Sequence, residues 1–590
     1  MADTVSLYDT TLRDGMQGEG MSLSADEKVR VAHALDDLGI HFVEAGFPSS
    51  NPKEEALFEL LADEHFQHAE IAAFGMTRRR DLAVAADPAL RLLADCFAPV
   101  CTLVGKTWSL HLEKVTRVDP EENLRMIAES VAFLCAQGKR VIYDAEHFFD
   151  AHAEDPAYAL RCLRAAAEAG AENLTLCDTN GATLPTTLAD AVAEVVAQLG
   201  GQVGIGIHTH DDAGCGVANS LVAVEAGARL VQGTMNGYGE RCGNANLATI
   251  LADTQLKLGF ECVAEERLAR LTETAHLVDE LCNVAPHPDQ PYVGANPFAH
   301  TGGLHVAGVA RDARTFEHVD PALVGAGRRV LVSELAGRGT VQARAGERGM
   351  QIDDATATRI VARVKELEHR GYQLEAADGS LDLLIRRETG AYEPLFRLES
   401  WRVIVEKRQA GTPSAEERRP IAAGGAQPDR GGAQPDRRSV EHRAPSSGEH
   451  RTEALTRPST AGSVSTEATI KIWVGGERYV RTAEGNGPVN ALDSALRSAI
   501  GETYPHLRDI ELVNFKVRIL DERKGTGAVT RVLLDATDGR ETWGAIGVSE
   551  NVIEASWEAL VDSLEAGMLP APARDAPALG AGPARGSEAR

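Results

Sequence analysis

The sequence predicts an α/β fold: a (β/α)₈ TIM barrel, then a helical and mixed subdomain, then a small C-terminal α+β domain. Three observations predict it. Residues 1–260 alternate short β-branched or apolar runs with longer amphipathic stretches. Residues 409–466 are rich in Gly, Pro, Ser, Arg, Glu and Gln and contain few large apolar residues. Strand and helix patterns resume at Ala468.

The first region contains eight predicted strands separated by helical patterns. The strands are predicted at Ser6–Asp9, Phe42–Ala45, Ile71–Gly75, Phe97–Val104, Arg140–Ala145, Asn173–Cys177, Val203–His208 and Leu230–Met235. Helices are predicted between them, for example at Ala25–Leu38, Asn123–Gln137, Tyr158–Ala169 and Leu188–Leu199. Eight strand–helix units in about 260 residues fit a closed barrel better than an open doubly wound sheet, which is the structural alternative.

The rest of the chain divides by composition. We expect the barrel at 1–264, the helical and mixed subdomain, covering the barrel mouth, at 265–407, and a disordered linker at 408–467. The linker includes a tandem repeat, Gly-Gly-Ala-Gln-Pro-Asp-Arg, at 424–430 and 431–437. The C-terminal domain follows at 468–568, and a disordered tail at 569–590. In that domain, strands are predicted at Ala468–Val474, Phe515–Leu520 and Val529–Asp535, and helices at Pro488–Ile500 and Asn551–Leu564.

Composition excludes several function classes. The formal net charge of −27 disfavours binding to nucleic acid or an anionic membrane. No apolar run approaches the length of a membrane helix, and the N-terminus resembles no secretory signal. The nine cysteines are scattered between Cys96 and Cys282 without a C-x-x-C pair. We therefore expect a cytoplasmic protein without a disulfide framework.

Four polar side chains at predicted strand ends indicate a metal site. Asp14 follows the first strand, His208 and His210 end the seventh, and Asn244 follows the eighth. Closure of the barrel makes these strands neighbours, and two His at i and i+2 of a strand face the same side. One carboxylate, two imidazoles and one amide oxygen suit Zn²⁺, Mn²⁺, Co²⁺ or Mg²⁺. The alternative is a pair of hydrogen-bonded histidines without a metal.

Three further residues are candidates for contacts to a substrate. Arg13, beside Asp14, suits an oxyanion or a polarised carbonyl, and its alternative role is a surface ion pair. Glu146, at the end of the fifth strand, is placed to touch substrate or to transfer a proton. Thr179, after the sixth strand, could donate to a substrate carboxylate or could cap a helix.

Four motifs resemble the family of 2-isopropylmalate, homocitrate and citramalate synthases. They are D-T-T-L-R-D-G at 9–15, L-C-D-T-N-G at 176–181, H-T-H-D-D at 208–212 and N-G-Y-G-E-R-C-G-N-A-N-L at 236–247. The resemblance covers the chain except the linker and tail. The stretches G-M-Q-G-E-G-M-S-L-S at 15–24, D-A-E-H-F-F-D-A at 144–151 and E-G-N-G-P-V-N-A-L-D at 484–493 resemble the citramalate-forming type.

The resemblance implies a Claisen-type condensation of acetyl-CoA with a 2-keto acid, here pyruvate, and hydrolysis to (R)-citramalate and CoA in isoleucine biosynthesis. Asp14, His208, His210 and Asn244 carry over as ligands of the metal that chelates the keto acid. Arg13 and Glu146 carry over as catalytic residues, and Arg13, Gln17, Glu146 and Thr179 as substrate contacts. His305 is the candidate catalytic base, or else a hydrogen-bonding residue at a helix N-terminus. This chain has Phe316 where the family usually has Tyr, so a tyrosine hydroxyl cannot assist there.

The resemblance also implies a homodimer whose C-terminal domain binds a feedback inhibitor, isoleucine or leucine. Formation of 2-isopropylmalate from 2-oxoisovalerate, or of homocitrate, is the alternative reaction, because no single residue decides the keto acid. A retro-Claisen lyase is disfavoured by the C-terminal domain. A non-catalytic amino-acid sensor is disfavoured by the retained Arg13, Glu146 and four metal ligands.

Overall fold

The computed structural model describes residues 3–48, 51–333, 336–407, 464–521 and 527–569. The chain divides into two compact units. Among described residues, the first contains the chain up to His300 and Leu304–Val330, and the second contains Thr301–Gly303 and the chain from Leu331 onward. Most of the predicted linker and nearly all of the predicted tail lie outside the described residues.

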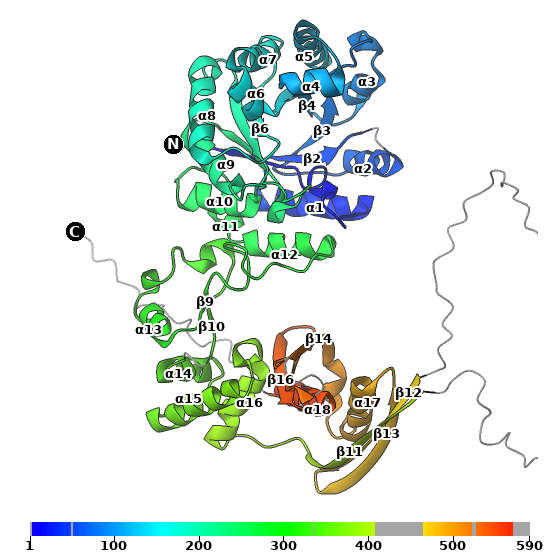
Figure 1. Ribbon diagram of the computed structural model, residues 1–590, viewed down its shortest axis with the longest axis vertical. Coiled ribbons are helices and arrows are strands. Elements are labelled where there is room, and N and C mark those ends of the chain that lie inside the picture. The colour runs from blue at the N-terminus through cyan, green and yellow to red at the C-terminus, as the bar shows by residue number, and fades with distance from the viewer. Residues whose placement is uncertain (1–2, 49–50, 334–335, 408–463, 522–526, 570–590) are drawn as a thin grey trace, which may run out of the picture. The chain divides into compact units, whose positions relative to one another are not determined.

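The first unit contains a closed, eight-stranded parallel barrel (Figure 1). The strands follow one another in chain order, and β1 closes the barrel by pairing with β8 in parallel, Ser6 opposite Leu230. The predicted barrel is confirmed, and the open sheet is wrong. The strands are β1 Ser6–Asp9, β2 Phe42–Gly46, β3 Glu70–Met76, β4 Val100–Lys106, β5 Arg140–Glu146, β6 Asn173–Asp178, β7 Gly204–Thr209 and β8 Leu230–Gly233.

Helix-start signals in the sequence place the barrel helices. Ser24 and Glu27 form a capping box at the start of α1, and Gly39 ends the helix with a φ of 93°. Five other helices begin with proline at the first helical position, where its missing N–H costs nothing. The helices are α1 Ala25–Leu38, α2 Pro52–Ala62, α3 Pro88–Asp95, α4 Ser109–His111, α5 Pro120–Ala136, α6 Phe148–Glu154, α7 Pro156–Glu168, α8 Pro185–Leu199, α9 Gly216–Glu225 and α10 Leu247–Leu256.

An apolar layer inside the barrel supports a polar layer at the carboxyl ends of the strands. The apolar layer is a separate buried cluster with one residue each from six strands: Tyr8, Phe42, Ala72, Val100, Ile142 and Leu230. Two residues further along their strands, Ile142 is followed by Asp144 and Leu230 by Gln232, both buried. Because side chains alternate along a strand, these polar groups face the same interior. The barrel therefore presents its polar groups at its carboxyl-terminal end.

Short elements complete the first unit. They are α11 Glu265–Leu268, α12 Leu271–Leu281, most of α13 Gly303–Arg311, and a two-stranded parallel sheet of β9 Ala299–His300 and β10 Arg329–Val330. Asn236, in the loop after β8, ties this loop to α12 because its side-chain amide donates to Asp279 (2.8 Å) and to the Ala275 carbonyl (2.8 Å). None of the described helices is both long enough and apolar enough to span a membrane.

The second unit is helical and then α+β, as predicted. Helices α14 Arg338–Glu347, α15 Asp354–His369 and α16 Asp378–Thr389 come first. Two antiparallel three-stranded sheets follow, each packed against a helix. The first comprises β11 Arg397–Lys407, β12 Val464–Val474 and β13 Glu477–Gly485 with α17 Pro488–Ile500. The second comprises β14 Glu511–Ile519, β15 Thr530–Thr537 and β16 Thr542–Ser549 with α18 Val552–Gly567.

The sheet of β11, β12 and β13 contains residues from both sides of the predicted linker. Strand β11 precedes the linker and pairs antiparallel with β12, Lys407 opposite Val464. The first four residues of β12 lie within the segment 408–467. A strand from the predicted subdomain 265–407, β11, therefore pairs with the first strand of the predicted C-terminal domain.

Candidate active site

Three predicted ligands come together in the polar layer of the barrel. Asp14, His208 and His210 each offer one ligand atom, and these atoms lie within 4.8 Å of one another. The Nε2 atoms of the two histidines are 3.2 Å apart, and His208 Nε2 is 3.6 Å from a carboxylate oxygen of Asp14. All three residues are buried. Ligand atoms bound to one ion at about 2.1 Å lie roughly 3.0–3.4 Å apart, so this spacing fits a single divalent cation.

A chain of buried hydrogen bonds orients His208. Its Nδ1 lies 2.9 Å from the side-chain oxygen of Gln232, so Nδ1 carries the proton and donates. The Gln232 amide in turn donates to Asp144 at 2.9 Å. The Nε2 atom of His208 therefore has its lone pair toward Asp14 and His210. Metal-binding histidines are commonly held in this way by a partner on the other ring nitrogen.

A glycine-rich loop after β8 returns Asn244 to the site. An isolated antiparallel β-bridge pairs the backbone of Asn244 with that of His210. The side-chain nitrogen of Asn244 donates to the Tyr238 carbonyl at 3.1 Å. Gly239 has a φ of 154°, and a Cβ there would lie 2.3 Å from that nitrogen. Glycine is thus required for the approach of the Asn244 side chain.

The electrostatic state of the site also favours a cation. Burial alone would raise the pKa of Asp14, but the positive charge of Arg13 and a hydrogen bond from the Asn244 side chain help to lower it to about 2. Burial lowers the pKa of His208 to about 3 and also lowers that of His210. At neutral pH the site therefore combines one carboxylate with two neutral imidazoles, the protonation states that metals bind.

Unpartnered atoms support the same conclusion. Among described residues, the side-chain oxygen of Asn244 and Nδ1 of His210 are buried without a hydrogen-bond partner. A buried acceptor without a partner costs about 1–3 kcal/mol. Asn244 is paired with His210 by a backbone bridge, so its free side-chain oxygen is a candidate fourth donor beside Asp14, His208 and His210. The buried Asp14, His208 and His210 triad is consistent with a divalent metal site.

Arg13 lies between two carboxylates and an aromatic ring. Its guanidinium pairs with Glu44 on β2 and with Asp14 at 3.0 Å, and its Cζ lies 3.9 Å from the centre of the Phe74 ring. Glu44 is fully buried and accepts a hydrogen bond from Tyr8 at 2.7 Å. Burial opposes the charge on Arg13, but Glu44 and Asp14 raise its pKa. The side chain is only 17% exposed, so the alternative of a surface ion pair is wrong.

A cavity of about 340 Å³ opens beside the three ligands. Its lining contains most of the residues predicted from the sequence: Arg13, Asp14, Gln17, Glu146, Thr179, His208 and His210. Asn244 is buried next to His210 and is not part of the lining. Glu146 pairs with Lys106, which also lines the cavity. The cavity thus brings together three of the four predicted metal ligands and all four predicted substrate contacts.

His305 is not among the residues that line this cavity. It lies exposed on α13, and its ring centre is 4.1 Å from that of Phe316. Phe316, which is 44% exposed, has no hydroxyl to offer, so His305 makes an apolar contact at this position. Its role as the catalytic base stays a prediction.

Three known families match successive parts of the chain. Residues 4–278 match the HMGL-like family, and residues 292–372 match the homocitrate synthase post-HMGL domain-like family. Residues 453–568 match the LeuA allosteric (dimerisation) domain. These matches follow the barrel, the following subdomain and the C-terminal domain in order.

Relatives that match almost the whole chain identify its family more closely. The (R)-citramalate synthase of Geobacter sulfurreducens is 42% identical over 95% of this chain and 97% of its own. That of Synechocystis is 43% identical over 95% of this chain and 96% of its own. This chain belongs to the (R)-citramalate synthase family. A protein of Methanopyrus kandleri named "Probable 2-isopropylmalate synthase" is 31% identical over 95% of this chain and 98% of its own.

Three further residues of the site lie outside the sequence motifs. Glu44 holds Arg13, Gln232 orients His208, and Lys106 pairs with Glu146. Each lies within a barrel strand. The sequence feature that could have identified them is a charged or amide side chain within an otherwise apolar strand, as in Phe42-Val43-Glu44-Ala45. Burying such a group is costly unless it has a specific partner.

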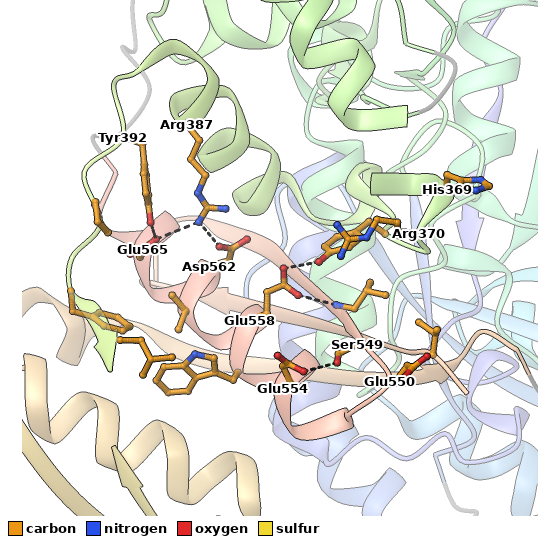
Figure 2. Close-up of a pocket in the computed structure, with 18 residues that line it drawn as sticks. His369, Arg370, Arg387, Tyr392, Ser549, Glu550, Glu554, Glu558, Asp562 and Glu565 are labelled. Carbon is orange, nitrogen blue, oxygen red and sulfur yellow. Dashed lines mark hydrogen bonds and ion pairs between the residues drawn. The ribbon is translucent and has the colours of Figure 1, made fainter. Parts of the chain in front are cut away.

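A second cavity, of about 1040 Å³, lies in the second unit between α18 and the segment around α16 (Figure 2). A row of carboxylates, spaced by three or four residues, lines it along one face of α18. Each carboxylate accepts a hydrogen bond from a neighbouring side chain. The pairs, carboxylate first, are Glu554 and Ser549, Glu558 and Tyr372, Asp562 and Arg387, and Glu565 and Tyr392. Since its carboxylates are partnered within the protein, we regard this row as a structural junction between α18 and the residues near α16.

Proposed function

We propose that this protein is an (R)-citramalate synthase, which condenses acetyl-CoA with pyruvate and water to give (R)-citramalate and CoA. The observation that carries the proposal is identity over almost the whole chain. Relatives named (R)-citramalate synthase share 42% and 43% of residues with it, whereas the relative named for 2-isopropylmalate shares 31% over the same fraction of the chain.

Asp14, His208, His210 and Asn244 would hold the divalent cation, of the Zn²⁺, Mn²⁺, Co²⁺ or Mg²⁺ class. When bound, such a cation supplies Lewis-acid polarisation of the 2-oxo group of the keto acid. The protein's own contribution is a fixed donor set, because His208 is oriented through Gln232 and Asn244 through the Tyr238 carbonyl. Little reorganisation is then needed when substrate enters.

The residues around the cavity supply the polar contacts for the keto acid and the enolate of acetyl-CoA. Arg13, fixed by Glu44 and Asp14, places a permanent positive charge where negative charge develops on oxygen. The Thr179 hydroxyl accepts a hydrogen bond from the backbone N–H of His147 at 3.0 Å, so its own proton can be donated to a substrate carboxylate. Gln17, which follows β1, and Glu146, at the end of β5, are the other proposed substrate contacts, and both line the cavity. His305 is the proposed base.

Three apolar side chains, Phe74, Met76 and Val104, line the same cavity. They offer the methyl group of pyruvate an apolar wall. Each additional methyl or methylene group changes selectivity by about 1–3 kcal/mol in such a pocket. Because 2-oxoisovalerate has two more carbons than pyruvate, discrimination between them is expected to be at least about tenfold.

The proposal is tested by release of free thiol from acetyl-CoA with pyruvate, 2-oxoisovalerate or 2-oxoglutarate, with Mg²⁺, Mn²⁺, Co²⁺ and Zn²⁺ in turn. We expect kcat/KM to be at least about tenfold higher with pyruvate and to require a divalent cation. A higher value with 2-oxoisovalerate would support 2-isopropylmalate formation. Absence of thiol release with every keto acid and metal would reject an acyltransferase and revive the amino-acid sensor.

We also propose that the C-terminal domain binds isoleucine or leucine as a feedback inhibitor at the start of α17. The match to the LeuA allosteric domain supports an effector in this domain. Gly487 precedes α17 with extended backbone (φ −174°), and no side chain caps the helix. The free N–H groups of a helix N-terminus attract anions, so they suit the carboxylate of an amino acid.

Replacing Gly487 with aspartate is expected to raise the inhibitory concentration of isoleucine or leucine at least tenfold. The new carboxylate would cap the helix itself and repel the carboxylate of the effector. A Cβ at Gly487 meets no atom within 4 Å, so the domain should remain folded. Initial rates are measured against effector concentration, with Gly487→Ala as the control that adds no charge. Equal inhibition of Gly487→Asp and wild type would exclude this location.

We propose that β14 contributes to a homodimer interface. Phe515, Val517 and Ile519 alternate along β14, so they share one face, and each is 45–51% exposed. The strand pairs only with β15 among the described residues and is an edge of its sheet. An exposed apolar stripe on an edge strand is unusual in a monomer, and the dimerisation family that matches this domain supports a partner here.

Replacing Val517 with lysine is expected to shift the protein toward monomers, with at least a tenfold increase in the dimer dissociation constant. The charge would have to be buried in an apolar contact. Sedimentation velocity over a range of concentrations measures the change. Val480→Lys, which makes the same replacement on β13 at 44% exposure, is the control. A Val517→Lys protein as dimeric as wild type would place the interface elsewhere.

A further inference from the structure

A second group of metal-ligating side chains lies beside the catalytic cavity, around the ends of β4 and β5. Ligand atoms of His111, Glu146 and His147 lie within 4.8 Å of one another. His111 ends α4, Glu146 is the last residue of β5, and His147 follows it. We propose that these residues form a second, inhibitory site for Zn²⁺. Zinc binding here is independent of the proposed function, and only the inhibition rests on it.

His147 has the geometry of a prepared metal ligand. It is buried, and its Nδ1 lies 3.0 Å from the carboxylate of Asp150, which also accepts a hydrogen bond from Asn180 at 3.0 Å. This carboxylate fixes the proton on Nδ1, which leaves the lone pair on Nε2. A carboxylate behind a histidine is the common arrangement around protein-bound zinc.

The backbone of His147 is held in an unusual conformation. Its φ of 55° is in the left-handed region, which a residue with a side chain rarely adopts. The backbone N–H donates to Thr179, and the side chain is held by Asp150. Such conformations cluster at functional sites because the surrounding contacts must impose them. Here they direct the imidazole toward His111, whose ring centre is 4.3 Å away at 61°.

His111 is also positioned by its surroundings. Its ring stacks on Trp108, with centroids 5.6 Å apart, and the indole N–H of Trp108 donates to Glu154 at 2.6 Å. Among the described residues, Nδ1 of His111 is buried and has no hydrogen-bond partner. His111 and His147 therefore offer two oriented imidazoles side by side, which are two of the three ligands of the proposed zinc site.

The third ligand connects this site to the reaction. The carboxylate of Glu146 pairs with Lys106, and both side chains line the catalytic cavity. Two histidines and one glutamate are an established zinc donor set, whereas Mg²⁺ prefers oxygen ligands. A zinc ion at His111 and His147 would compete with Lys106 for Glu146 and remove that carboxylate from the substrate cavity. Zinc is therefore expected to inhibit the enzyme even when another cation supports catalysis.

Equilibrium dialysis of the full-length protein against Zn²⁺ tests the site directly. We expect two zinc ions per wild-type chain, one in His111→Ala and one in Asp14→Ala. Asp150→Asn, which preserves the size of the side chain, should weaken binding of one ion by about 10- to 100-fold. His152→Ala is the matched control, because His152 lies on α6 and pairs with Glu194 outside the group. One zinc per wild-type chain, or two in His111→Ala, would overturn the site.

Inhibition is measured by thiol release from acetyl-CoA with pyruvate in saturating Mg²⁺, with Zn²⁺ added in steps. The concentration for half-inhibition should rise at least tenfold in His111→Ala and stay unchanged in His152→Ala, with basal rates similar to wild type. The same half-inhibition in His111→Ala and wild type would overturn the inhibitory role. If no keto acid supports thiol release, the proposed function fails, and the dialysis result still decides the zinc site.

Discussion

Replacing Asp14 with alanine is expected to remove the bound divalent cation and most of the catalytic activity together. Asp14 is the only carboxylate of its ligand set, and it is buried within ligand distance of His208 and His210. Its loss leaves two neutral imidazoles and an amide, without a negative charge to balance the ion. A Lewis-acid contribution of several kcal/mol is lost with the metal, so kcat should fall by at least ~10³-fold.

Metal content after dialysis, measured on the same sample as the rate of thiol release, checks this expectation. Asp190→Ala is the matched control, because Asp190 is exposed on α8 and makes the same change outside the cavity. The control should keep wild-type activity and catalytic metal. Full occupancy of the catalytic metal in Asp14→Ala would refute the ligand set.

Replacing Glu44 with glutamine is expected to lower kcat by at least ~10²-fold, about 2.7 kcal/mol, without loss of the catalytic metal. The buried Glu44 carboxylate fixes the guanidinium of Arg13 and accepts a hydrogen bond from Tyr8. Glutamine keeps the shape but removes the charge that holds the guanidinium. Arg13 would then be held by Asp14 alone and would be less well placed to stabilise an oxyanion.

This second prediction is checked by kcat, KM for the keto acid and metal content of Glu44→Gln. Glu172→Gln is its control, because Glu172 forms an exposed pair with Arg140, and such pairs contribute only about 0–1 kcal/mol. Unchanged kcat in Glu44→Gln would mean that the position of Arg13 does not depend on Glu44. A loss of metal along with activity would instead assign Glu44 to the metal site.

The barrel could be predicted because its strands are short, apolar and separated by helices with clear start signals. Predicted and observed strands agree within a few residues, and the largest difference is β4, which begins at Val100 rather than Phe97. The sheet of β11, β12 and β13 was harder to predict. Strand β11 pairs with β12 across the whole segment 408–463, and local periodicity contains no information on so distant a partner.

The same distinction applies to the site. Asp14, His208 and His210 could be selected because they lie at the ends of β1 and β7, which barrel closure places on either side of β8. Glu44, in contrast, lies inside a strand, where its role depends on a partner from another strand. His111 and His147 are separated by 36 positions, and only the packing of α4 against the end of β5 brings their rings together.

The most direct test of the central claim is a crystal structure of the protein with Mn²⁺ and pyruvate, recorded with anomalous scattering from manganese. We expect an anomalous peak within about 2.3 Å of Asp14, His208 and His210, with pyruvate oxygens completing the coordination beside Arg13. A peak away from these three residues, or pyruvate bound without contact to the metal, would contradict it.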